Sequence, residues 1–146
     1  MQTSSKKAFT MIELIFVIVV IGILSAIAIP KLAATRDDAQ ITRGLATLAS
    51  VRSAIATERQ KQILRGEFTG ITSLRGTTPG TFTTFNDVNG SRVLEYDIAP
   101  CSTGSIGCWS GDGVDYTFTA ASGDCDYKLL NNRFVEDGGA GCVDMK

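Results

Sequence analysis

The chain has 146 residues, of which 44% are hydrophobic and 20% charged, a composition that suits one ordinary domain and excludes a disordered or collagen-like chain. Its formal net charge of −1 gives no electrostatic basis for binding nucleic acid, so we infer no nucleic-acid partner. The chain has no His, which removes the usual general base and every Ser-His-Asp or Cys-His arrangement, so we expect neither an enzyme nor a cofactor.

The first predicted element is an apolar segment, residues 9–29, in which Glu13 is the only charged residue. About 20 apolar residues suffice for a helix that crosses a bilayer, so we expect a membrane-spanning helix. A secretory signal peptide is the alternative, with residues 6–7 (KK) as its basic region, cleavage after residues 26–28 (AIA) and a mature chain from about Ile29. The run is long for a signal peptide, and a carboxylate at mid-bilayer costs about 2.5–3.5 kcal/mol, which suggests that Glu13 has a functional partner.

Residues 6–14 (KKAFTMIEL) resemble the leader end and cleavage site of type IV pilins and of the related pseudopilins of type II secretion. The resemblance implies that a prepilin peptidase cuts between Ala8 and Phe9, that Phe9 is N-methylated, and that Glu13 serves assembly. Family members usually carry Gly at the position of Ala8.

The resemblance also divides the chain into three parts. Residues 1–8 are the expected leader peptide, residues 9–30 the transmembrane and assembly helix, and residues 31–146 the pilin head domain. Gly22 and Pro30 fall where family members carry a helix-loosening glycine and a kink-forming proline. Because Pro30 lacks a backbone donor, we expect a bend or local melting of the helix there.

Cleavage before Phe9 would provide a partner for Glu13. The cut leaves an ammonium group at the start of a helix, with Glu13 one turn away on the same face. Paired within a subunit or between neighbours, the two groups neutralise charges that are otherwise unpaired in a low-dielectric bundle. Because Lys6 and Lys7 keep the N-terminus in the cytoplasm, the chain beyond Pro30 is expected on the outer, oxidising side of the membrane.

Residues 31–65 are expected to continue the helix and to end it near Gly66. They contain no Pro and one Gly, and their apolar residues recur in steps of 3 and 4, which predicts one amphipathic stripe. The stripe consists of Ile41, Leu45, Leu48, Val51 and Ile55, while Arg43, Arg52, Arg59 and Lys61 occupy other faces. The whole helix would run about 80 Å, so half of it must contact other subunits or lipid.

The remainder of the chain is rich in glycine and predicts a small antiparallel sheet. Its β-prone runs are residues 81–85, 92–98, 114–120 and 127–135, the last interrupted by Asn131 and Asn132. Apolar residues alternate within 114–120, from Val114 to Ala120, so one face of that strand should cover the helix stripe. Turn-type dipeptides at 112–113 and 131–132 predict a meander. The expected fold class is therefore α+β and pilin-like, with a long N-terminal helix packed on a small antiparallel sheet.

Four cysteines on the outer side of a membrane predict disulfides. We favour Cys101 with Cys108 and Cys125 with Cys142, because each pair closes a local loop and the second would hold the Gly-rich C-terminal segment. Crossed pairing stays open, and zinc held by four thiolates is a further alternative. Trp109 is expected to pack in the core rather than to serve as a binding platform.

The acidic turns around Asp112 and Asp115, with Asp124 and Asp126 nearby, are a candidate calcium site. They lack the spacing of an EF-hand, and the Pro-Trp-Gly-x-Pro run of calcium-binding major pseudopilins is missing. We expect solvated turn acids and assign no metal. The same absence, with the C-terminal cysteine pair, favours a type IV pilin over a pseudopilin.

The sequence thus predicts a structural subunit that is made as a single-pass precursor in the bacterial inner membrane, with its N-terminus in the cytoplasm. The resemblance implies trimming by prepilin peptidase and transfer by an inner-membrane assembly platform into a helical filament of pilin subunits, in the periplasm or at the cell surface. The alternative is a membrane-anchored or secreted binding or adhesion module that uses the apolar segment only as a signal or anchor. The N-terminal residue of the mature protein distinguishes the two.

Overall fold

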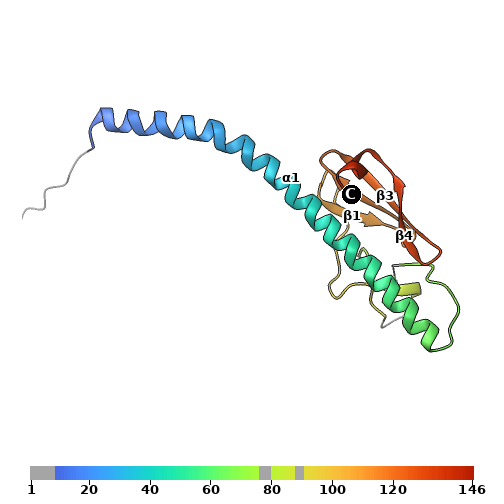
Figure 1. The fold of residues 1–146 in the computed structure, drawn as a ribbon. Coiled ribbons are helices and arrows are strands. Elements are labelled where there is room, and N and C mark those ends of the chain that lie inside the picture. Colours follow the sequence, from blue (N-terminus) through green and yellow to red (C-terminus); the bar gives the residue numbers. More distant parts are fainter. Residues whose placement is uncertain (1–8, 76–79, 88–90) are drawn as a thin grey trace, which may run out of the picture. The chain divides into compact units, whose positions relative to one another are not determined.

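A computed structural model of the chain describes residues 9–75, 80–87 and 91–146 (Figure 1). A long helix, α1 (Met11–Leu64), precedes a sheet and two short 3-10 turns. The remaining elements are η1 (Phe85–Asp87), β1 (Cys108–Gly111), β2 (Asp115–Ala120), β3 (Gly123–Leu130), β4 (Arg133–Gly138) and η2 (Ala140–Val143). The chain separates into two compact units, Met1–Arg36 and Asp37–Lys146, and α1 contributes to both. The predicted α+β, pilin-like fold is confirmed.

The ends of α1 follow from local hydrogen bonding. Thr10 precedes the first helical residue, and its side-chain Oγ1 accepts the backbone N–H of Glu13 at 3.4 Å. At the other end Gly66 has a φ of 77°, and its N–H donates to the carbonyl of Ile63 at 3.0 Å. The predicted end near Gly66 is therefore confirmed. Helical backbone continues through Gly22 and Pro30 without melting, and a kink at these positions stays a prediction.

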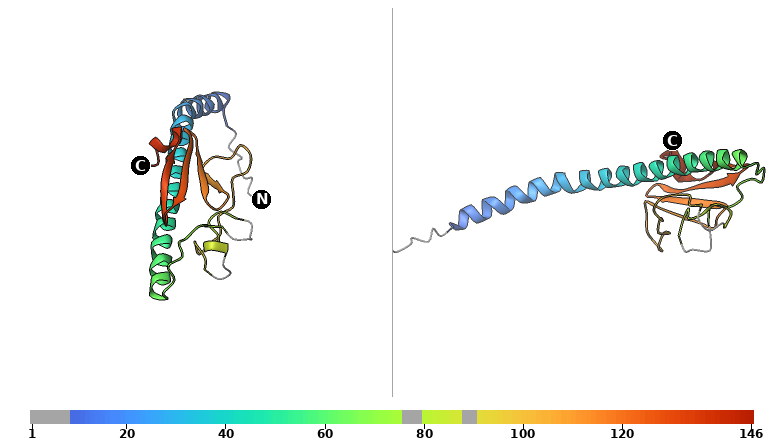
Figure 2. Two further views of the ribbon diagram at one scale, coloured as in Figure 1. Left: turned by 90° about the vertical axis from the view of Figure 1, so that its right-hand side faces the viewer. Right: turned by 90° about the horizontal axis from the view of Figure 1, so that it is seen from below.

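Within the unit Asp37–Lys146, α1 runs along the sheet (Figure 2). It buries one stripe of side chains against the core. The stripe is the predicted one, with Leu48, Val51 and Ile55 buried and Ile41 and Leu45 partly buried against the same core. Gly44 lies on this stripe as well. A Cβ atom at Gly44 would lie 2.6 Å from the ring of Phe118, so the absence of a side chain allows β2 to approach the helix closely.

The four strands form an antiparallel meander in the order β1-β2-β3-β4, and the predicted small antiparallel sheet is confirmed. Asn131 and Asn132 connect β3 to β4 with φ values of 49° and 61°, the left-handed conformation that a two-residue hairpin turn requires. Inward-facing residues of β2 are buried, as expected from the alternation. Val114 was expected to point inward with them, but it precedes β2 and is 37% exposed.

Two of the predicted strands are wrong. Residues 81–85 and 92–98 form isolated bridges, between Thr81 and Ile98 and between Thr84 and Arg92, and not regular strands. The φ of Phe82 is 57°, which interrupts an extended backbone. The first strand of the sheet is instead β1, a four-residue segment that was not among the predicted strands.

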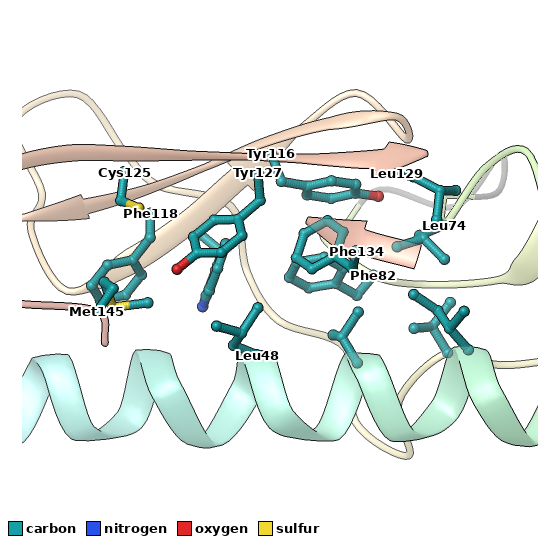
Figure 3. Packing of buried hydrophobic residues seen from close by; sticks show 14 of the residues in the cluster. Leu48, Leu74, Phe82, Tyr116, Phe118, Cys125, Tyr127, Leu129, Phe134 and Met145 are labelled. Atoms are coloured by element: carbon teal, nitrogen blue, oxygen red, sulfur yellow. The ribbon is translucent and has the colours of Figure 1, made fainter. Parts of the chain in front are cut away.

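Aromatic side chains fill the space between the sheet and α1 (Figure 3). Phe82 stacks on Tyr116 with ring centroids 4.3 Å apart, and Tyr127 stacks on Phe134 at 5.4 Å. Trp109 is 2% exposed and contacts Phe82 edge to face at 5.4 Å, so it is a core residue as expected.

Both favoured disulfides are present. Cys101 is bonded to Cys108 with their Cα atoms 5.4 Å apart, and Cys125 is bonded to Cys142 with 4.7 Å between Cα atoms. All four cysteines lie in the described part of the chain and none is free, which rules out both crossed pairing and thiolate-bound zinc. The second bond joins β3 to η2, and so fixes the Gly-rich C-terminal segment to the sheet.

Candidate assembly site

The first turns of α1 present apolar side chains that nothing in the described chain covers. Every large apolar side chain from Phe9 to Leu32 is exposed, with exposed fractions from 37% at Val20 to 82% at Phe9. Among the described residues, α1 is the one helix long and apolar enough to cross a bilayer. A continuous apolar surface of this extent requires lipid or other protein chains around it.

Glu13 is the one charged side chain in residues 9–29, and it lies in the first turn of α1. The structure describes three ion pairs, Lys61 with Glu58, Arg92 with Asp97 and Lys128 with Asp115, so no described basic group pairs with Glu13. An acidic side chain suits the positive end of the helix dipole. It is nevertheless left without a counter-ion within the described part of its own chain.

Thr10 is a helix cap that was not predicted from the sequence. It caps α1 through its hydrogen bond to the backbone of Glu13, and so fixes where the helix begins relative to that carboxylate. The signal was available, since Thr10 and Glu13 have the spacing of a capping box, Thr-x-x-Glu.

The expected processing site extends beyond the described residues. Lys6, Lys7 and Ala8 lie outside them, whereas Phe9, the residue after the expected cut, lies just before the cap and is exposed. Cleavage and N-methylation therefore stay predictions. A Cβ atom at Gly22 would meet nothing within 4 Å, so nothing that the structure describes requires a glycine at that position.

The acidic residues of these turns make hydrogen bonds that stabilise the sheet. Asp112 accepts backbone hydrogen bonds from Val114 and Asp115, both at 3.0 Å, and closes the connection from β1 to β2. These bonds, that from Val114 foremost, lower the pKa of Asp112. Asp126 accepts a hydrogen bond from the hydroxyl group of Thr117, with 2.7 Å between the oxygens. The residues that the structure describes contain no cluster of three or more His, Cys, Asp or Glu placed to hold a metal ion.

Comparison with known proteins agrees with this geometry. Residues 3–29 match the family model described as the prokaryotic N-terminal methylation motif. The chain is 43% identical over 83 residues to the type IV narrow pilus major component PilA5 of Thermus thermophilus, a match that covers 56% of this chain and 72% of that protein.

Two further relatives match over shorter stretches. A fimbrial protein of Pseudomonas aeruginosa is 40% identical over 63 residues, which are 43% of this chain and 38% of that protein. The type IV major fimbrial protein FimA of Dichelobacter nodosus is 43% identical over 54 residues, or 37% of this chain and 35% of that protein. No solved structure matches the chain significantly. On the extent of the match to the Thermus protein, together with the methylation motif, the chain belongs to the type IV pilin family.

Proposed function

We propose that this pilin is a structural subunit of a type IV pilus, trimmed between Ala8 and Phe9 and polymerised through residues 9–29. The observation that carries the proposal is the contrast within α1. One part buries a stripe against a closed, disulfide-bonded head, whereas the first turns expose a continuous apolar surface that contains one unpaired carboxylate. A module that needed only an anchor would gain nothing from that carboxylate.

Before assembly, lipid covers the exposed segment. Basic residues Lys6 and Lys7 favour a cytoplasmic N-terminus, so a single crossing places the head on the periplasmic side of the inner membrane. Both disulfides lie in that head, where an oxidising compartment allows them to form.

During assembly, neighbouring helices replace the lipid. Lipid tails are as apolar as the helix surface, so close packing and polar contacts, not burial alone, must drive the exchange. Cleavage exposes the amino group of Phe9, which stays cationic when it is methylated. Paired with Glu13 of a neighbouring subunit, that ammonium fixes the axial register of one helix against the next.

The precursor has three partners on its way into the filament. A prepilin peptidase cuts and methylates the precursor, an inner-membrane platform moves it out of the bilayer, and like subunits complete the filament. The relatives are named as pilus and fimbrial components, which favours a pilus over a secretion pseudopilus.

Replacement of Glu13 by Ala tests the proposal in cells that produce filaments. We expect normal membrane insertion and normal trimming, because neither depends on the charge pair, but loss of sheared filaments. Glu13→Gln should also abolish sheared filaments, since it removes the charge and keeps the size of the side chain. Glu67→Gln is the control, because it removes an exposed charge after the helix, and it should assemble normally. A normal filament yield from the Glu13 variants would refute the assembly mechanism.

A further inference from the structure

A groove of about 440 Å³ lies between one flank of α1 and the β3–β4 hairpin, within the unit Asp37–Lys146. Ile55 and Phe134 contribute buried apolar surface, and Val135 is half-buried beside them. The groove is also lined by two exposed guanidinium groups, those of Arg52 on α1 and Arg133 on β4. We call it the basic groove.

Both arginines of the basic groove lack a counter-ion among the described residues, whose three ion pairs involve other side chains. Arg52 donates from Nε to the carbonyl of Phe134 at 3.1 Å, which holds its side chain against β4 and leaves both Nη groups without a described partner. The side chain of Arg133 has no described hydrogen bond. A guanidinium presents a planar fork that matches a carboxylate, so the two together select a carboxylate-bearing surface.

The same unit carries such a surface on the outer side of its sheet. On β3, Asp124 and Asp126 alternate with the buried Cys125 and Tyr127 and therefore face outward. Lys128 follows them and is paired with Asp115 at 3.0 Å. We call the outer carboxylates and their single lysine the acidic face: Asp115, Asp124, Asp126, Asp137 and Lys128.

The acidic face has an excess of negative charge. Asp137 is near enough to contribute to the raised pKa of Lys128, although the hydrogen bond from Asp115 has the largest effect. Four carboxylates and one ammonium leave a formal charge of −3, and neither Asp124 nor Asp137 has a described ion-pair partner.

We propose that the basic groove of one subunit receives the acidic face of a second copy of this chain. The inference rests on the proposed function, because it concerns heads that a filament already brings together. The two surfaces share no residue, although both include β4, so the contact pairs unlike patches of the two subunits.

The contact sets the orientation of the heads, and a reversed charge in it opposes assembly because it places like charges together. Exposed ion pairs each contribute little and are weakened by salt, whereas the apolar segment provides most of the association. Complementary charge instead selects one docking arrangement and rejects those that juxtapose like charges.

Charge reversal in the full-length chain, in cells that assemble it, tests the contact. We expect Arg133→Glu and Asp137→Lys each to lower the ratio of sheared filament to membrane-held subunit by at least roughly fivefold, and the double variant to recover it to within about twofold. Arg43→Glu is the matched control, because Arg43 is an exposed arginine of α1 that does not line the groove. Its ratio should not change.

Cross-linking gives a second readout that does not depend on yield. Cells that produce both an Arg133→Cys chain and an Asp137→Cys chain should yield disulfide-linked dimers from oxidised filaments, and the pair Arg43→Cys with Asp137→Cys should not. The proposed contact is wrong if the single variants leave the filament ratio unchanged, or if the double variant has a ratio as low as theirs. It is also wrong if both cysteine pairs cross-link equally. If the unsubstituted chain forms no filaments at all, the proposed function fails, and the contact fails with it.

Discussion

Three buried polar atoms in the head have no hydrogen-bond partner among the described residues. They are Nε1 of Trp109 and the hydroxyl groups of Tyr116 and Tyr127, whose side chains are 1–2% exposed. Burial of an unpaired hydroxyl destabilises a fold, typically by about 1–3 kcal/mol. The stacked contacts that the aromatic rings make with one another in the core oppose this cost.

Burial raises the pKa of Tyr116 and of Tyr127, so the free energy of unfolding should fall at alkaline pH. Below the ordinary tyrosine pKa of 10.0, both the folded and the unfolded chain keep the proton and this group adds no pH dependence. At higher pH the unfolded chain loses the proton first, so the free energy of unfolding falls.

Replacement of Tyr116 by Phe should therefore leave stability at neutral pH equal or higher by up to about 1 kcal/mol, and should flatten its decline between about pH 9 and about pH 11. Urea unfolding of the full chain in detergent measures both. Tyr96→Phe is the control, because Tyr96 is 82% exposed. A Tyr116→Phe variant less stable than the parent at neutral pH would show that the hydroxyl is hydrogen-bonded.

At the scale of single elements, the two glycines of α1 have opposite surroundings. A methyl group at Gly44 would collide with the ring of Phe118, which is fully buried, whereas one at Gly22 would meet nothing in the described chain. Alanine is the better helix former by about 1 kcal/mol, so the two substitutions separate packing from propensity.

We expect Gly44→Ala to lower the free energy of unfolding of the head by about 1–3 kcal/mol, because overpacking outweighs the gain in propensity. Gly22→Ala should leave the head unchanged. The melting temperatures of the two variants are measured by thermal unfolding in detergent. Equal melting temperatures would contradict this prediction and would show that Phe118 moves aside at little cost.

The two disulfides close loops of different length and should therefore stabilise the fold by different amounts. Cys125 and Cys142 are 17 residues apart, and Cys101 and Cys108 are 7 apart. Loop entropy alone predicts about 3 kcal/mol for the longer loop and about 2 kcal/mol for the shorter. The Cys125→Ser/Cys142→Ser variant should therefore unfold at lower denaturant than Cys101→Ser/Cys108→Ser, and the reverse order would contradict this account.

Elements that form because of their own residues could be predicted from the sequence, whereas elements that depend on tertiary packing could not. The helix stripe, the cap at Gly66 and the Asn131–Asn132 turn follow from periodicity and from backbone preferences of single residues, and all three are confirmed. By contrast, β1 is four residues long and contains Ser110 and Gly111, so it has little strand propensity of its own. Pairing of Trp109 with Phe118 on β2 makes it a strand.

The converse error has the same origin. Residues 81–85 and 92–98 have the composition of strands, but Phe82 adopts a left-handed φ and its ring is buried against Tyr116. Packing of one aromatic side chain thus overrode the local preference. The candidate assembly site was easier to predict, because its chemistry is a carboxylate in an apolar run and is visible without tertiary structure.

For the whole molecule, the average composition conceals two environments. The apolar residues of the unit Asp37–Lys146 are mostly buried in one core, whereas those before Pro30 are exposed throughout. A soluble domain with that much uncovered apolar surface would aggregate. The division is expected for a subunit that lies first in a bilayer and later in a filament.

The N-terminus of the filament subunit tests this account most directly. Mass spectrometry of the N-terminal peptide from sheared filaments should find a chain that begins at Phe9 and carries one methyl group on its amine. A filament or membrane fraction in which the chain begins at Ile29 or keeps Met1 would contradict the account, because the ammonium that Glu13 requires would then be absent from its place.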